Sequence, residues 1–173
     1  MNVADFQELY RYNHGVRKSY LESLPLLLPW DELARNRQTA WVSIKDTMLH
    51  IIWAEDTWIN YSMQGVEDPR RPFPYASYAD WDGIASYGAH VMTTVEGRLS
   101  SMQDADLDRQ VSRVNSDGIR RKMKARDVLM HVFTEEVHHR GEIIAMLWQM
   151  DVQPPDMGWA LTLGRTDPPW HMK

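Results

Sequence analysis

Apolar residues recur at steps of three and four along four long stretches of the chain, and this periodicity constrains the fold most strongly. The stretches cover residues 3–24, 43–63, 78–102 and 125–150. The spacing is the period of one face of an α-helix, and each stretch is long enough for several turns. Pro25 and Gly65 interrupt the chain after the first and second stretches. The pattern predicts an all-α fold, a four-helix bundle.

Length and composition are those of a globular protein. With 173 residues, 43% apolar and 25% charged, the chain is expected to form one domain over residues 1–173. Residues 151–173 contain four prolines and are expected to form a coil tail. No apolar run reaches the ~18 residues of a membrane span, and the first residues lack the pattern of a signal peptide. We therefore expect a cytoplasmic protein that makes no membrane contact.

The polar region of residues 104–124 separates the third and fourth predicted helices. Asn115-Ser116-Asp117-Gly118 is a turn signal with valines before it and Ile119 and Met123 after it, which predicts a small β-hairpin. Basic residues are frequent between Arg113 and Arg126, so a phosphate-binding patch and a solvated connecting segment are alternative interpretations. The formal net charge of −5 favours the connecting segment and argues against a nucleic-acid partner.

The fourth stretch carries two polar residues on an otherwise apolar face. The residues at steps of three and four are Ala125, Val128, Val132, Glu135, His139, Ile143, Met146 and Met150. A carboxylate and an imidazole in a bundle core cost several kcal/mol unless something compensates them. Residues four apart on a helix lie one above the other, so both side chains reach one point. Either a bound divalent cation or a buried Glu–His pair satisfies this pattern.

A histidine in the second helix favours the cation. His50 lies in the middle of that helix, between Leu49 and Ile51. Alone, such a residue is more often a hydrogen-bonded core histidine than a ligand. Together with Glu135 and His139 it forms a set of three protein ligands with coordination positions left open. The sequence thus predicts one mononuclear metal site made of these three residues.

Two further histidines of the fourth helix are alternative ligands. His131 precedes Glu135 by four residues, but two helical turns, ~12 Å, separate it from His139. His138 forms Glu135-x-x-His138, the spacing found in di-iron bundles. A di-iron site needs a second motif of this kind on another helix, and the sequence has none. One metal ion is therefore preferred to two.

Three segments of the chain match a known family pattern. They are Tyr12-Asn13, the stretch Ser43–Trp58 (like S-x-x-x-x-L-x-H-I-x-x-A-E-x-x-W) and the stretch His131–Ile143 (H-V-F-T-E-E-V-H-H-R-G-E-I, like H-x-x-x-H-R-G-Q-I). With these segments in this order, the chain resembles the DinB/YfiT-like superfamily of metal-dependent bundle proteins. The resemblance implies a four-helix bundle, usually a homodimer. Its members with assigned chemistry are thiol-dependent transferases or isomerases that use low-molecular-weight thiols.

The resemblance also implies a ligand set. The family holds its metal with one histidine of the second helix and two of the fourth, which correspond here to His50, Glu135 and His139. Glu135 stands where a histidine is usual, and Glu142 where a glutamine is usual. Two histidines with one carboxylate remain a competent set for zinc, nickel, manganese or iron.

The predicted metal site, with open coordination positions, is expected to belong to an enzyme acting on a small molecule, and the resemblance implies a thiol-dependent transferase or isomerase, with a hydrolase as a further possibility. The chain has no cysteine, so any thiol must come from a cosubstrate. Tyr12, Asn13, Glu55 and Trp58 are candidate pocket residues, with ordinary packing as the competing interpretation. The catalytic residues cannot be assigned, and a non-catalytic metal-binding stress-response bundle is the alternative function. His14 is expected to be an ordinary helix residue.

Overall fold

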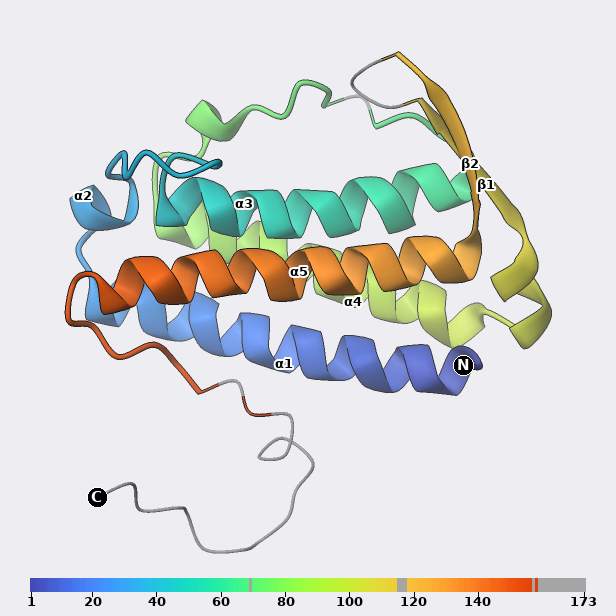
Figure 1. The fold of residues 1–173 in the computed structure, drawn as a ribbon, viewed down its shortest axis with the longest axis horizontal. Helices are drawn as coiled ribbons and strands as arrows, with labels where there is room; N and C mark the ends of the chain where they lie inside the picture. The colour runs from blue at the N-terminus through green and yellow to red at the C-terminus, as the bar shows by residue number, and fades with distance from the viewer. Residues whose placement is uncertain (69, 115–117, 157, 159–173) are drawn as a thin grey trace, which may run out of the picture.

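The computed structural model describes residues 1–68, 70–114, 118–156 and 158. Its four long helices form the predicted bundle (Figure 1). They are α1 (Val3–Leu27), α3 (Ile44–Glu55), α4 (Trp81–Ser101) and α5 (Ala125–Trp148), and a short α2 (Trp30–Leu33) follows α1. None of the described helices is long and apolar enough to span a membrane.

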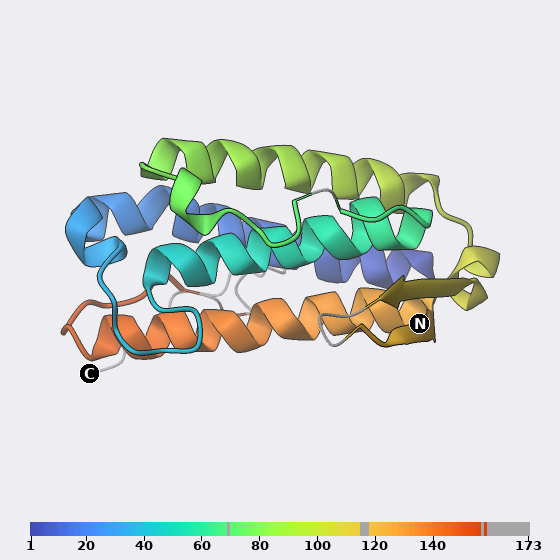
Figure 2. The ribbon, with the colours of Figure 1, turned by 90° about the horizontal axis from the view of Figure 1, so that it is seen from above.

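The four long helices pack in a square. Helix α1 lies beside α4 and α5, and α3 lies beside the same two neighbours (Figures 1 and 2). Helices α1 and α5 run in one direction, whereas α3 and α4 run in the opposite one (Figure 1). Helix α3 therefore meets α5 antiparallel, so side chains from the middle of each helix can face each other.

Side-chain caps set the helix starts. The Ser43 hydroxyl accepts a hydrogen bond from the backbone N–H of Asp46, and the Asp80 carboxylate accepts one from that of Gly83. Each cap satisfies a backbone donor that the first helical turn leaves unpaired. Helix α4, which corresponds to the third predicted stretch (residues 78–102), therefore begins at Trp81, slightly later than predicted.

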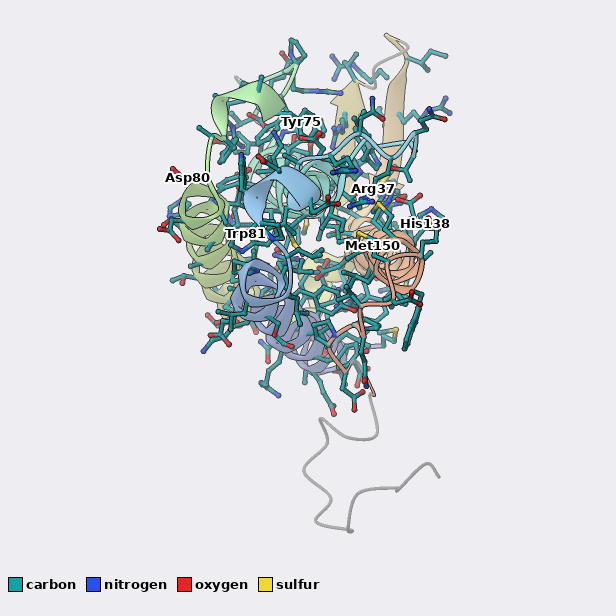
Figure 3. All side chains as sticks on the ribbon, turned by 90° about the vertical axis from the view of Figure 1, so that its left-hand side faces the viewer. Arg37, Tyr75, Asp80, Trp81, His138 and Met150 are labelled. Atoms are coloured by element: carbon teal, nitrogen blue, oxygen red, sulfur yellow. The ribbon has the colours of Figure 1, made fainter. Side chains whose placement is uncertain are left out.

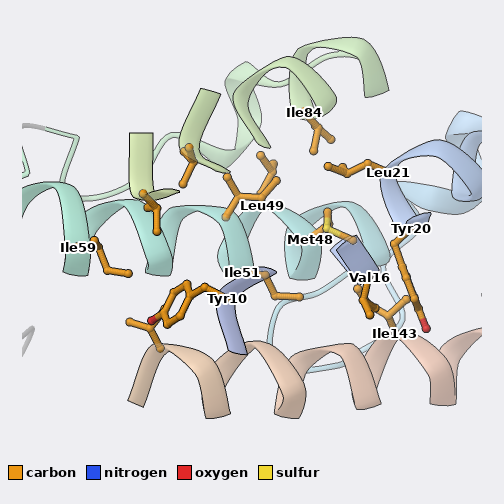
Figure 4. Packing of buried hydrophobic residues seen from close by; sticks show 14 of the residues in the cluster. Tyr10, Val16, Tyr20, Leu21, Met48, Leu49, Ile51, Ile59, Ile84 and Ile143 are labelled. Atoms are coloured by element: carbon orange, nitrogen blue, oxygen red, sulfur yellow. The ribbon is translucent and has the colours of Figure 1, made fainter. Parts of the chain in front are cut away.

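Aliphatic and aromatic side chains from all four long helices fill the core (Figure 4). Helix α4 approaches its neighbours closely at Gly88. A Cβ there would lie 2.8 Å from Cδ1 of Leu21 and 3.3 Å from Cδ1 of Ile52. The glycine thus permits the close contact of α4 with α1 and α3.

The stretch predicted as the second helix is helical over its whole length, but the type of helical turn changes along it. Helix α3 passes into a π-helical turn, η1 (Asp56–Tyr61), and a 3₁₀ turn, η2 (Ser62–Gln64), and it stops at Gly65 with φ of 73°. The Ser62 hydroxyl donates to the carbonyl of Thr57 at 2.9 Å and helps to hold the wider turn. The predicted extent of the helix is confirmed, but the π turn was not predicted, because apolar periodicity does not distinguish a π turn from an α turn.

The predicted hairpin is present between α4 and α5. Strand β1 (Gln110–Val114) pairs antiparallel with β2 (Arg120–Lys124), and Val111 lies opposite Met123. Two 3₁₀ turns, η3 (Tyr75–Ser77) and η4 (Asp104–Asp108), lie in the connections before and after α4. The hairpin stands at the end of the bundle where η1 ends and α5 begins (Figures 1 and 2). Residues 159–173 of the predicted tail lie outside the described residues.

Candidate metal centre

His50 of α3 and the pair Glu135 and His139 of α5 face each other where these helices pack. The Nε2 atom of His139 lies 3.3 Å from Oε2 of Glu135, and Nε2 of His50 lies 3.8 Å from the same oxygen. One potential ligand atom from each residue lies within 4.8 Å of the others. Three donors of this kind around one point fit a divalent cation such as zinc.

The other nitrogen of each imidazole has its own partner. His50 Nδ1 lies 3.4 Å from the Tyr75 hydroxyl, and His139 Nδ1 lies 2.9 Å from Oε2 of Glu142. These contacts leave both Nε2 atoms turned toward Glu135. Metal-binding histidines characteristically have such a partner, because it fixes the ring orientation and the tautomer.

An indole ring covers the site. Trp41 stacks on His50 with centroids 3.6 Å apart and meets His139 edge-on at 6.1 Å. It belongs to the loop between α2 and α3, which crosses toward α5 (Figure 2). His50 is 8% exposed and His139 is 7% exposed. Burial, and then the nearby His139, lower the pKa of His50 to about 3, so its imidazole is neutral near pH 7.

A second cluster on α5 shares one of these residues. His138, His139 and Glu142 also bring ligand atoms within 4.8 Å of one another. However, His138 is exposed on the outer side of α5 (Figure 3), and all three residues come from one helix. His131 is in neither cluster of the described residues, and its ring meets Trp58 edge-on at 5.2 Å. The first cluster, which joins two helices, is the more enclosed.

The core face of α5 differs from the predicted stripe at its centre. Glu136 is the buried carboxylate, at 2% exposure, whereas the side chain of Glu135 is 35% exposed. Glu135 therefore lies at the edge of the apolar face, where it turns toward His50. The sequence pattern did not identify Glu136, because the partner that pairs with it most closely, Arg17, comes from another helix.

Glu136 belongs to a buried network of charged residues. Arg17 of α1 donates to both Glu136 and Glu55, and Arg140 Nη1 lies 3.4 Å from Oε1 of Glu136. Arg140 Nη2 also donates to Oδ1 of Asn13 at 2.8 Å. The two arginines and two glutamates balance in charge, which is the condition under which burial of such groups is tolerated.

His14 extends this network and is not the ordinary helix residue that was expected. It is buried, with Nε2 at 2.8 Å from Oε1 of Glu55 and Nδ1 at 2.9 Å from Oε1 of Glu96. Burial disfavours the charged imidazole, but the charge and hydrogen bond of Glu55 outweigh it, and the pKa of His14 is raised. Burial also opposes the charge of Glu55, but the Arg17 guanidinium outweighs it and lowers the pKa of Glu55 to about 2.

The four candidate pocket residues occupy two different environments. Asn13 and Glu55 are fully buried in the ionic network. Tyr12 and Trp58 are half-buried, each beside an arginine: Arg140 lies 5.6 Å from the Tyr12 ring and Arg113 lies 4.0 Å from the Trp58 ring. Asn13 and Glu55 accept hydrogen bonds from arginines of this network, and Trp58 meets the ring of His131.

A cleft of about 1210 Å³ adjoins the site. Trp41 and Tyr75, which both contact His50, contribute to its lining. The remainder comes from α3, η1 and η2, the segment before η3 and the hairpin, including Arg71, Arg113 and Arg120. Trp41 and Tyr75 had no sequence pattern to mark them, because each reaches the site from a connecting loop.

Known proteins resemble this chain over nearly its full length. Uncharacterized protein YizA of Bacillus subtilis is 28% identical over 165 residues, which covers 95% of this chain and 98% of YizA. A DinB-like protein from Bacillus cereus has a similar structure, with a TM-score of 0.69 at 19% identity over 90% of this chain and 97% of that one. The DinB-like protein YjoA of Bacillus subtilis gives a TM-score of 0.63 at 16% identity over 88% and 96%.

At these identities the two solved structures establish the fold alone. The sequence pattern of the DinB family, by contrast, matches residues 1–167. This match covers all four long helices and the three candidate ligands. The chain belongs to the DinB family.

Proposed function

We propose that this protein binds one divalent metal ion through His50, Glu135 and His139 and is a metal-dependent enzyme acting on a small molecule. Transfer of a low-molecular-weight thiol to an electrophile, or a related isomerisation, is the reaction that we favour over hydrolysis. The observation that carries the proposal is the orientation of the two histidines. Both Nε2 atoms face one carboxylate oxygen while both Nδ1 atoms have other partners.

The residues of the site have separate tasks in this proposal. His50 and His139 supply neutral nitrogen donors, and Glu135 supplies a negative charge that offsets part of the charge of the ion. Glu142 and Tyr75 hold the two imidazoles in place. A divalent ion at this point would lower the pKa of a bound water or thiol, or polarise a carbonyl group.

The number of donors and the residues beside them favour a catalytic metal over a purely structural one. Among the residues that the structure describes, three protein donors meet at the point, which leaves coordination positions for a substrate. Trp41 and Tyr75 lie both beside His50 and along the cleft, so a molecule in the cleft would approach the ion next to them. Because the chain lacks cysteine, the thiol is a cosubstrate.

Turnover of glutathione or free cysteine with a chlorinated nitrobenzene tests the reaction class. In this assay a sulfur–carbon bond forms, chloride leaves, and the thiol proton passes to solvent. We expect turnover by the metal-loaded protein, its loss after chelation, and its return when zinc, nickel, manganese or iron is added back. His139→Ala is expected to be inactive, and His138→Ala, which changes the exposed neighbour, to retain activity.

Metal binding without turnover toward any thiol and electrophile pair would favour the non-catalytic bundle instead. Turnover that is unchanged by chelation would contradict the role of the metal.

A further inference from the structure

The hairpin places a guanidinium group in the cleft in an unusual environment. Arg113 of β1 lies over the ring of Trp58, 4.0 Å from its centroid, so the aromatic face fixes the plane of the cation. Its Nη1 atom is shielded from solvent and has no hydrogen-bond partner among the described residues. A buried donor without a partner is costly, and a ligand that accepts its hydrogen bond removes the cost.

Two further arginines line the same cleft. Arg71 Nη1 donates to the carbonyl of Val114 at 3.0 Å, and Arg120 Nη1 donates to the Ser112 hydroxyl at 3.2 Å. These neutral acceptors orient the side chains but do not offset their charges. In the part of the chain that the structure describes, Arg71, Arg113 and Arg120 form no ion pair.

The positive charges of Arg71 and Arg113 repel each other. Burial, and then the charge of Arg71, lower the pKa of the Arg113 guanidinium to about 10. Asp68 also lines the cleft, but its carboxylate already accepts hydrogen bonds from Arg70 and from the indole N–H of Trp53. Among the described residues that line the cleft, the exposed Glu67 is thus the one carboxylate that is not already engaged in these hydrogen bonds.

We propose that Arg113, together with Arg71 and Arg120, binds an oxyanion group, a carboxylate or a phosphate, of a small molecule that occupies the cleft. Guanidinium groups suit such groups because they donate paired hydrogen bonds to two oxygens. The formal net charge of −5 and the position inside a cleft favour a small anion over the backbone of a nucleic acid.

The subsite has a defined position relative to the candidate metal centre. Trp58, beneath Arg113, follows His50 by eight residues, which corresponds to ~12 Å along the helix. A molecule with its anionic group on Arg113 and its reacting group at His50 would be extended over this distance. The anion subsite stands on the arginines alone, whereas its part in a reaction rests on the proposed function.

Binding of inorganic phosphate and of succinate, measured separately by calorimetry at low ionic strength, tests the subsite. We expect saturable binding of at least one of the two anions, and the tighter one identifies the oxyanion preferred. Arg113→Gln is expected to weaken it about tenfold, and Arg71→Gln to weaken it in the same direction. Arg109→Gln is the matched control, because it removes the same charge from an exposed position outside the cleft.

His50→Ala separates this proposal from that of the metal centre. If the arginines form the subsite, His50→Ala retains the anion affinity of the wild type whether or not the protein binds a metal. Three results would overturn the subsite: no saturable binding of either anion, an equal loss in Arg109→Gln and Arg113→Gln, or a loss in His50→Ala with none in Arg113→Gln. The last result would place the anion on the metal.

Discussion

The rings of His50 and His139 meet edge to face across the contact of α3 with α5, with centroids 4.7 Å apart. The two residues are far apart in the sequence, and the antiparallel packing of their helices brings them together. The carboxylate of Glu135 lies against both rings, at 3.3 Å from one and 3.8 Å from the other. This arrangement gives the chain a compact set of three donors beside a cleft.

Adjacent glutamates of α5 are expected to respond differently to the same substitution. Glu135→Gln removes the charged donor at the site, so zinc affinity should fall about a hundredfold or more, since even an outer partner contributes tenfold to a hundredfold. Glu136→Gln leaves Arg17 and Arg140 with less buried countercharge and should lower the free energy of unfolding by about 3 kcal/mol. Chelator competition measures the first effect and urea unfolding the second. Similar profiles for the two variants would contradict the division of roles.

Glu142 is expected to act on the metal through His139. Its carboxylate lies 2.9 Å from Nδ1 of that residue, so Glu142→Ala frees the ring to turn. We expect zinc affinity to fall about tenfold while one ion still binds per chain. Titration against a chromophoric chelator measures the change. A complete loss of binding would indicate that Glu142 is itself a ligand, as the cluster with His138 requires.

Trp41 is expected to slow the exchange of the metal. Its indole covers His50 at 3.6 Å, and Trp41→Ala would open the ring to solvent. A stacked aromatic contact contributes about 1 kcal/mol, so release of the ion to excess chelator should be several-fold faster. Stopped-flow release measures this rate, with Trp148→Ala, at an exposed position of α5, as the matched control. Equal rates in both variants would show that the indole does not restrict access.

The stability of the protein is expected to fall as pH rises through the pKa of His14. The folded-state pKa of His14 is raised, because the charge and hydrogen bond of Glu55 outweigh the effect of burial, which lowers it. The charge of Arg17 also lowers this pKa, and the hydrogen bond with Glu96 also raises it. The stabilisation is therefore complete below the unfolded pKa of about 6.5 and is lost as pH rises through the higher folded value. Urea unfolding with chelator present, at pH values on both sides of this window, should show a slope that His14→Gln reduces. An unchanged slope would contradict a charged His14 in the core.

The bundle and the hairpin follow from local features of the sequence. Apolar spacing marks each long helix, and Asn115-Ser116-Asp117-Gly118 between apolar residues marks the turn. The π turn of η1 was not predicted, because a single wider turn leaves the apolar pattern nearly unchanged. Local patterns therefore define elements better than they define irregularities within them.

The candidate site was partly predictable for a related reason. The steps along α5 and the position of His50 identify a set of three residues that the fold brings together. The pairing of Arg17 with Glu55 and Glu136 was missed, since it joins three helices whose relative rotation no local pattern gives. Trp41 was not predicted either, because it lies in a loop, where the direction of a side chain depends on tertiary packing.

Metal analysis of the purified protein and of three histidine variants tests the central claim most directly. His139 faces His50 and Glu135, whereas His138 points to solvent from the next position of α5. Elemental mass spectrometry should find about one divalent ion per chain in the wild type and in His138→Ala, and almost none in His139→Ala or His50→Ala. Equal metal content in all four proteins would contradict a site formed by His50, Glu135 and His139.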